Sequence, residues 1–193
     1  MYPANFEYFA PTSVDEALTI LERFGDDGKV LAGGMSLIPV MKLRFAAPRA
    51  LVDINRVGGL DGLTTGGGVT IEALVRHRTC ERAEALKGRY GVLGDAARQI
   101  ADPIVRNLGT VCGSLAHADP QGDWGSVMLA VRAELVARGG SGERAIPIDE
   151  TAKNSTSHGR GCSQGRSRRL SSPTRSSPRC ASPIRGSVRA GRI

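Results

Sequence analysis

Two segments of the chain carry residues whose types and spacing suit phosphate binding. The first covers residues 30–37, Val-Leu-Ala-Gly-Gly-Met-Ser-Leu, where a buried strand leads through paired glycines and a hydroxyl into a helix. Glycines bring backbone N–H groups close to a ligand, and a helix N-terminus favours an anion. This pattern is typical of a phosphate or pyrophosphate site. It is not Gly-x-Gly-x-x-Gly, and glycines that serve turn geometry alone are the alternative interpretation.

The second segment covers residues 107–123. A strand is expected at Thr110–Val111, followed by a glycine loop at Gly113–Ser114 and by Asp123 near the start of a helix. Two loops that converge from separate elements could hold both phosphates of a dinucleotide. An aspartate beyond them suits the hydroxyl groups of a ribose or ribityl chain.

Other chemically capable side chains are less specific. His117 has no identifiable nucleophile partner and is more typical of a structural role. Asp119 and Asp123 form no convincing metal site without further ligands. The four cysteines are scattered without a Cys-x-x-Cys pair, so neither a zinc site nor a disulfide framework is indicated.

The elements that must position these segments alternate in the first third of the chain. Strands are expected at 6–9, 29–32 and 51–54, with helices at 14–24 and 37–44. The later pattern differs: it predicts a hairpin of 60–64 with 69–73, helices at 91–100 and after Asp123, and a strand pair of 134–138 with 145–148. The first part therefore reads as a βαβ unit, and the second as mixed helix and antiparallel strand.

Charge and aromatic content change sharply near residue 150. The chain carries a net charge of +7, yet residues 151–193 hold ten Lys or Arg and no acid, whereas all eight aromatic residues lie before them. Such a segment has little to bury and should be disordered in isolation. We expect the fold to end near Glu150. An Arg/Ser-rich nucleic-acid-binding tail is the competing hypothesis.

Two further classes of protein are disfavoured. No apolar run approaches the roughly 18–20 residues of a membrane span. The N-terminus lacks a basic leader with an apolar stretch, so secretion is not indicated and the cytoplasm is the expected compartment.

Three stretches carry a resemblance to a known family. They are Ala-Gly-Gly-Met-Ser-Leu-Ile-Pro-Val-Met-Lys-Leu-Arg at 32–44, residues 100–124, and Ile-Glu-Ala-Leu-Val-Arg-His at 71–77. The chain resembles the FAD-binding (medium) subunit of molybdenum hydroxylases, of the carbon monoxide dehydrogenase and xanthine dehydrogenase type. The match runs over residues 1–150.

The resemblance implies an α+β fold with two FAD-binding subdomains. A small parallel βαβ subdomain would occupy residues 1–55, and a larger, mainly antiparallel one residues 56–150, incomplete at its C-terminus. FAD would lie between them. The implied cofactor-binding residues are Ala32, Gly33, Gly34, Met35, Ser36, Leu37, Ile100, Thr110, Val111, Cys112, Gly113, Ser114 and Asp123.

The resemblance also implies a function. Relatives are oxidoreductase subunits that pass electrons from [2Fe–2S] clusters through FAD to an external acceptor. Molybdopterin and the clusters would sit on a large and a small partner subunit, and no residue of this chain would be catalytic. The absence of clustered cysteines agrees with this division.

The sequence departs from the family pattern in two places that matter. Cys112 stands where relatives have the first glycine of Thr-x-Gly-Gly; if the position needs positive φ, its Cβ costs about 1 kcal/mol. Residues 151–193 resemble an out-of-frame translation, which suggests a truncated or frameshifted subunit with impaired function. A non-functional fragment is therefore a further alternative, beside the nucleic-acid-binding one.

Overall fold

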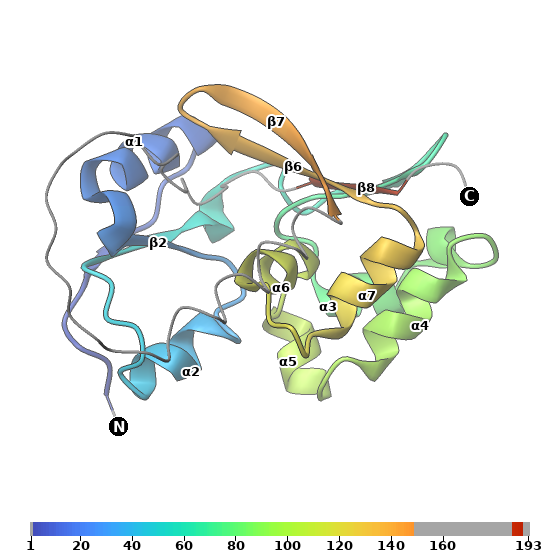
Figure 1. Ribbon diagram of the computed structural model, residues 1–193, viewed down its shortest axis with the longest axis horizontal. Helices are drawn as coiled ribbons and strands as arrows, with labels where there is room; N and C mark the ends of the chain where they lie inside the picture. The colour runs from blue at the N-terminus through green and yellow to red at the C-terminus, as the bar shows by residue number, and fades with distance from the viewer. Residues whose placement is uncertain (1, 149–186, 191–193) are drawn as a thin grey trace, which may run out of the picture.

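The computed structural model describes residues 2–148 and 187–190. Two units build the molecule, each with its own sheet and its own group of buried apolar residues (Figure 1). The N-terminal unit contains a parallel sheet, and the second contains an antiparallel sheet with a layer of short helices.

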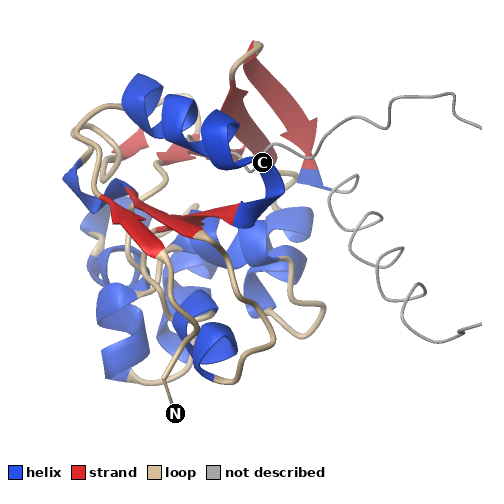
Figure 2. Ribbon diagram, turned by 90° about the vertical axis from the view of Figure 1, so that its left-hand side faces the viewer, coloured by secondary structure: helices blue, strands red, loops and turns tan. Residues whose placement is uncertain are grey.

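The parallel sheet has three strands in the order β1-β3-β2: β1 (Glu7–Phe9), β2 (Gly28–Leu31) and β3 (Ala50–Asp53). Parallel neighbours require crossover connections, which α1 (Val14–Phe24) and α2 (Leu37–Lys42) provide. Figure 2 shows a helix lying across this sheet; it is α1, whose Ala17 is fully buried against it. The predicted βαβ unit is confirmed.

Local sequence explains where α1 begins and ends. The Ser13 side chain accepts a hydrogen bond from the Glu16 amide at 3.2 Å, and the Glu16 carboxylate accepts one from the Thr12 amide at 2.9 Å. This reciprocal pattern is a capping box displaced by one residue. Gly25, at a φ of +53°, ends the helix, as the predicted turn requires.

The antiparallel sheet has five strands in the order β4-β5-β8-β6-β7. Their bounds are β4 (Leu63–Thr65), β5 (Val69–Ile71), β6 (Glu134–Gly139), β7 (Gly142–Pro147) and β8 (Ser187–Ala190). The β4–β5 hairpin is shorter than expected, and the β6–β7 pair agrees with the sequence. β8 lies between β5 and β6, where its register pairs Val188 with Ile71 and Leu135.

Five helices pack beside this sheet: α3 (His77–Arg82), α4 (Gly91–Gln99), α5 (Pro103–Leu108), α6 (Val111–His117) and α7 (Asp123–Ala130). Three short 3₁₀ turns complete the described elements: η1 (Gly25–Asp27), η2 (Ile54–Arg56) and η3 (Glu84–Leu86). Trp124, Leu93 and Met128 are fully buried between the helices and the sheet. A second core under the parallel sheet includes Ile54 and extends to Leu74.

Three local expectations differ from the structure. The strand expected at Thr110–Val111 is wrong: Thr110 makes a single antiparallel bridge with Arg76, and Val111 begins α6. The glycine loop expected at Gly113–Ser114 is likewise helical. The short helices α3 and α5 were not expected.

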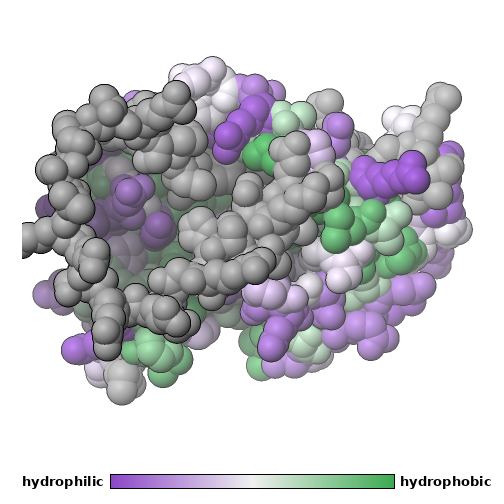
Figure 3. All heavy atoms as spheres, viewed as in Figure 1, coloured by the Kyte–Doolittle hydropathy of each residue, from purple (hydrophilic) through white to green (hydrophobic). Residues whose placement is uncertain are grey.

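The α+β class with a parallel and an antiparallel part is confirmed. Residues 151–186 and 191–193, where the basic tail was expected to be disordered, lie outside the described residues; at Ser187–Ala190 the structure has a strand where the sequence predicted none. Among the described helices, none is long and apolar enough to cross a membrane. In the lower right part of Figure 3, where the described residues are visible, hydrophilic and hydrophobic residues are interspersed.

Candidate functional site

The two glycine-bearing segments meet in space. A Cβ placed on Gly33 would lie 2.2 Å from the Leu108 carbonyl oxygen and 2.8 Å from the Gly109 Cα. Contacts that short with backbone are not tolerated, so only glycine fits at position 33. The convergence expected from the sequence is present, and it brings the end of β2 against the chain that enters α6.

The first segment turns sharply into α2. Gly34 is buried and has a φ of +72°, a conformation that glycine adopts at no steric cost. The Ile38 amide donates to the Gly34 carbonyl at 3.0 Å, and the exposed Ser36 N-cap makes no side-chain cap hydrogen bond. The first amides of a helix have no intrahelical acceptor. At this helix start Pro39 has no N–H and the Ile38 amide is already bonded, so the Leu37 amide is the first helical donor without an intrahelical acceptor, beside the exposed Ser36 hydroxyl.

The second segment is more committed to its own structure. The Thr110 hydroxyl oxygen accepts from the Gly113 amide at 3.1 Å, and the Thr110 carbonyl accepts from the Ser114 amide at 3.0 Å. The Val111 amide donates to the Val75 carbonyl at 3.1 Å. Three amides of this segment are thus already bonded within the protein. The second segment therefore forms a rigid wall beside the first loop, and these three amides are not available to a ligand.

Cys112 fits this wall without backbone strain. It lies in α6 and is buried, with its Sγ 3.6 Å from the carbonyl oxygens of Ile71 and Glu72. Since the position is helical, the cost expected for positive φ does not arise. Burial, reinforced by the Glu72 carboxylate, raises the pKa of the Cys112 thiol.

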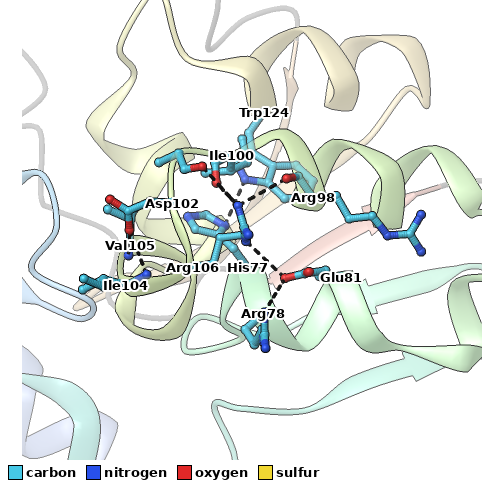
Figure 4. Close-up of polar contacts among 11 residues, drawn as sticks. His77, Arg78, Glu81, Arg98, Ile100, Asp102, Ile104, Val105, Arg106 and Trp124 are labelled. Atoms are coloured by element: carbon cyan, nitrogen blue, oxygen red, sulfur yellow. Dashed lines mark hydrogen bonds and ion pairs between the residues drawn. The ribbon is translucent and has the colours of Figure 1, made fainter.

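Asp123 is exposed and is the first residue of α7. The next residue, Trp124, anchors that helix: its Nε1 donates to His77 Nδ1 at 3.1 Å, and the two rings stack with centroids 5.9 Å apart (Figure 4). The His77 amide donates to the Gly109 carbonyl at 3.1 Å. His77 therefore links the start of α7 to the loop contact.

Ile100 is placed by Arg106. The Arg106 guanidinium donates to the carbonyl oxygens of Ile100 at 3.0 Å and Ala101 at 3.1 Å, and its Nε donates to Glu81 at 3.1 Å (Figure 4). The Arg106 side chain is only 13% exposed. These contacts fix the end of α4, so that Ile100 is held near the start of α5.

The remaining candidates from the sequence lie at the edge of the site. His117 is exposed at the end of α6, and Asp119 accepts from the Gln121 amide at 2.9 Å in the following turn. Among the described residues, no group of three His, Cys, Asp or Glu side chains is placed to hold a metal ion.

Sequence reasoning gave no role to His77 or Arg106. Their partners are distant along the chain, 47 residues for Trp124 and 25 for Glu81. The stretches that carry the resemblance include both residues, His77 in 71–77 and Arg106 in 100–124, but they specified no contact.

A parallel βαβ unit and an antiparallel sheet, with the two glycine segments in contact between them, define a two-part α+β domain. The sequence model of one family, described as the FAD binding domain in molybdopterin dehydrogenase, matches residues 4–162. The chain belongs to this family.

Curated relatives agree. The chain is 45% identical over 150 residues to the carbon monoxide dehydrogenase medium chain of Hydrogenophaga pseudoflava, covering 77% of this chain and 52% of the relative. It is 42% identical over 151 residues to the 6-hydroxypseudooxynicotine dehydrogenase complex subunit alpha of Paenarthrobacter nicotinovorans, covering 78% of this chain and 51% of the relative. The chain thus spans about half the length of these relatives.

Solved structures show the same fold. The carbon monoxide dehydrogenase of Hydrogenophaga pseudoflava that lacks the Mo-pyranopterin moiety superposes with a TM-score of 0.75 at 45% identity, over 77% of this chain and 52% of that one. A cyanide-inactivated Cu,Mo-CO dehydrogenase superposes with a TM-score of 0.79 at 28% identity, over 100% of this chain and 62% of that one. None of these comparisons supports the frameshift hypothesis or a nucleic-acid-binding tail.

Proposed function

We propose that this chain binds FAD and acts as the electron-transfer flavin subunit of a molybdopterin-containing hydroxylase. The observation that carries the proposal is the contact of Gly33 with Leu108 and Gly109, which brings the turn into α2 beside the wall formed by the second segment. That arrangement fits a diphosphate, and the family membership identifies the ligand class as FAD.

The roles proposed for individual residues rest on the family resemblance together with their positions in the fold. The backbone of 32–36 and the Ser36 hydroxyl hold the pyrophosphate, with Leu37 beside it. Thr110–Ser114 form the opposing wall. The exposed Asp123 accepts hydrogen bonds from the hydroxyl groups of the ribose or ribityl chain. Ile100 offers an apolar side chain to the flavin. FAD supplies the redox chemistry when it is bound, and the protein positions it and sets its electrostatic surroundings.

The remaining parts of the proposal concern the assembly. A large subunit would carry molybdopterin and a small one the [2Fe–2S] clusters, as the names of relatives that are medium chains or complex subunits suggest. An external acceptor would receive the electrons, and the complex would lie in the cytoplasm. Within this scheme the chain is an oxidoreductase subunit without a catalytic side chain of its own.

Titration calorimetry of the full chain tests the proposal. FAD is expected to bind at one molecule per chain, and ADP, which contains the pyrophosphate without the flavin, is expected to compete with it. Riboflavin, which lacks phosphate, should bind more weakly than either. No FAD binding, or riboflavin binding as tight as FAD binding, would contradict the proposal.

A further inference from the structure

Two side chains connect the glycine segments directly, and neither was among the predicted site residues. The Asn55 Nδ2 donates to the Ala32 carbonyl at 2.8 Å, and the Asn55 Oδ1 accepts from Arg76 Nη2 at 2.5 Å. The Arg76 Nη1 donates in turn to the Leu108 carbonyl. The two carbonyls at the ends of this series belong to Ala32, which precedes Gly33, and to Leu108, whose carbonyl Gly33 contacts.

Asp53 fixes the orientation of the Asn55 amide. Its Oδ1 accepts from Asn55 Nδ2 at 2.6 Å and from the Asn55 backbone amide at 2.9 Å, while its Oδ2 accepts from the Tyr8 hydroxyl at 2.5 Å. With both acceptors, Asp53 and Ala32, facing the NH₂ group, the Asn55 oxygen is turned toward Arg76. Burial alone would raise the pKa of Asp53, but the hydrogen bonds from Tyr8 and Asn55 lower it, so the carboxylate is charged at neutral pH.

Arg76 is held by its own backbone. The Arg76–Thr110 bridge is flanked by hydrogen bonds from Val111 to Val75 and from His77 to Gly109, each 3.1 Å long. The side chain therefore leaves from a point fixed on the second segment and reaches back to the first. The guanidinium fork can serve two carbonyl-type oxygens at once, which an ammonium cannot do with the same geometry.

We propose that Asn55 and Arg76 form a latch that holds the two glycine segments together where the FAD pyrophosphate would bind. The proposal rests on the proposed function. The close approach of Gly33 to Leu108 limits how near the segments can come, but packing of this kind has no directional preference. The latch adds directional hydrogen bonds on both sides of that contact, and both residues act as positioning residues.

FAD affinity of latch variants tests the proposal. Arg76→Met and Asn55→Ala should each weaken FAD and ADP binding at least tenfold, because the segments separate. Arg76→Lys keeps the positive charge but lacks the forked guanidinium. Its dissociation constant for FAD should therefore lie within threefold of that of Arg76→Met. The controls are Arg98→Lys, an exposed arginine paired with Asp95 at 2.8 Å, and Asn5→Ala, an exposed asparagine outside both segments; both should stay within twofold of the unmodified chain.

The double variant distinguishes a latch from two separate contacts. If Asn55 and Arg76 act as one unit, the combined variant binds FAD no more than threefold more weakly than Arg76→Met. Binding is measured at 10 °C after circular dichroism has shown each variant to be folded, so that a general loss of stability does not alter the dissociation constant. Unchanged affinity, full rescue by Arg76→Lys, or multiplicative losses in the double variant would overturn the latch.

Hydrogen exchange on the unliganded chain separates the latch from the proposed function. Arg76→Met is expected to speed amide exchange in peptides covering residues 33–37, while Arg98→Lys leaves it unchanged. If the unmodified chain fails to bind FAD, the proposed function is wrong, and this exchange result still decides whether the latch exists. Unaltered exchange in Arg76→Met rejects the latch.

Discussion

His77 is a buried histidine whose contacts require the neutral ring. It is 4% exposed, and its Nδ1 accepts a hydrogen bond from Trp124, which a protonated Nδ1 cannot do. Burial first, and then the nearby charges of Arg106 and Arg76, lower the pKa of His77 from 6.5 to about 4. Because this residue joins α7 to Gly109, its protonation disturbs the arrangement of the site as well as the core.

Stability is therefore expected to fall on mild acidification. Since the folded pKa lies below the unfolded one, the unfolded chain binds the extra proton, so the contribution is complete above pH 6.5 and lost as the pH falls toward 4. The loss attributable to His77 amounts to about 3 kcal/mol. Urea unfolding at pH 7 and pH 4 measures it.

Two variants isolate this effect. His77→Gln should be less stable at pH 7 and should show a smaller loss between pH 7 and pH 4. The exposed His117→Gln serves as the control and should keep the full pH dependence. An unaltered pH dependence in His77→Gln would show that the titration belongs to other groups.

At the scale of elements, α6 shows why part of the site was misread from sequence. Thr110 and Val111 are β-branched and favour strands, yet the Thr110 hydroxyl caps a helix through the Gly113 amide. A Cβ at Gly113 would lie 2.4 Å from that hydroxyl oxygen. The glycine that the sequence placed in a phosphate-binding loop is therefore needed for the helix cap. The expected strand is therefore wrong, because these residues begin a helix.

The start of the short helix α5 is marked in the sequence by Asp102 and Pro103. Asp102 caps it by accepting from the amides of Ile104 at 2.7 Å and Val105 at 2.9 Å, and Pro103 occupies the first turn. By contrast, α1 was predicted to the residue because a capping box, an apolar stripe and a terminal glycine all agree. Asn55 and Arg76 could not be found this way, since their partners are 23 and 32 residues distant.

Removing the α6 cap should weaken the wall of the site. Thr110→Val leaves the partly buried Gly113 amide without its acceptor, and we expect the free energy of unfolding to fall by about 1 kcal/mol. Thr110→Ser, which keeps the hydroxyl, should lose less. Denaturant unfolding of the two variants is the measurement, and equal stabilities would contradict the assigned cap.

On the scale of the whole molecule, the two units are tied together at several points. The Arg138 guanidinium on β6 pairs with Asp15 on α1 at 2.7 Å, where Figure 1 shows the β6–β7 hairpin reaching toward α1. The glycine contact and the Asn55–Arg76 latch are further ties. The periodicity of apolar residues predicted the parallel unit. It did not predict β8, because four residues in a basic, Ser-rich stretch carry no strand pattern.

β8 gives a test of the second sheet. Val188 pairs with both Ile71 and Leu135, so proline there removes an amide from a strand that has a neighbour on each side. Val188→Pro is expected to lower stability by about 1–3 kcal/mol, because a ladder hydrogen bond is lost. Val188→Ala keeps the amide and should have a smaller effect. Thermal unfolding that is identical for Val188→Pro and the unmodified chain would argue against this pairing.

The central claim, that the two glycine segments meet to hold a diphosphate, is tested most directly by FAD titration of Gly33→Ala. A methyl group at this position would collide with the Leu108 carbonyl, whereas one at Gly58 meets nothing within 4 Å, which makes Gly58→Ala the matched control. The account predicts that Gly33→Ala weakens FAD binding at least a hundredfold while Gly58→Ala binds as the unmodified chain does. Equal FAD affinity in all three proteins would contradict it.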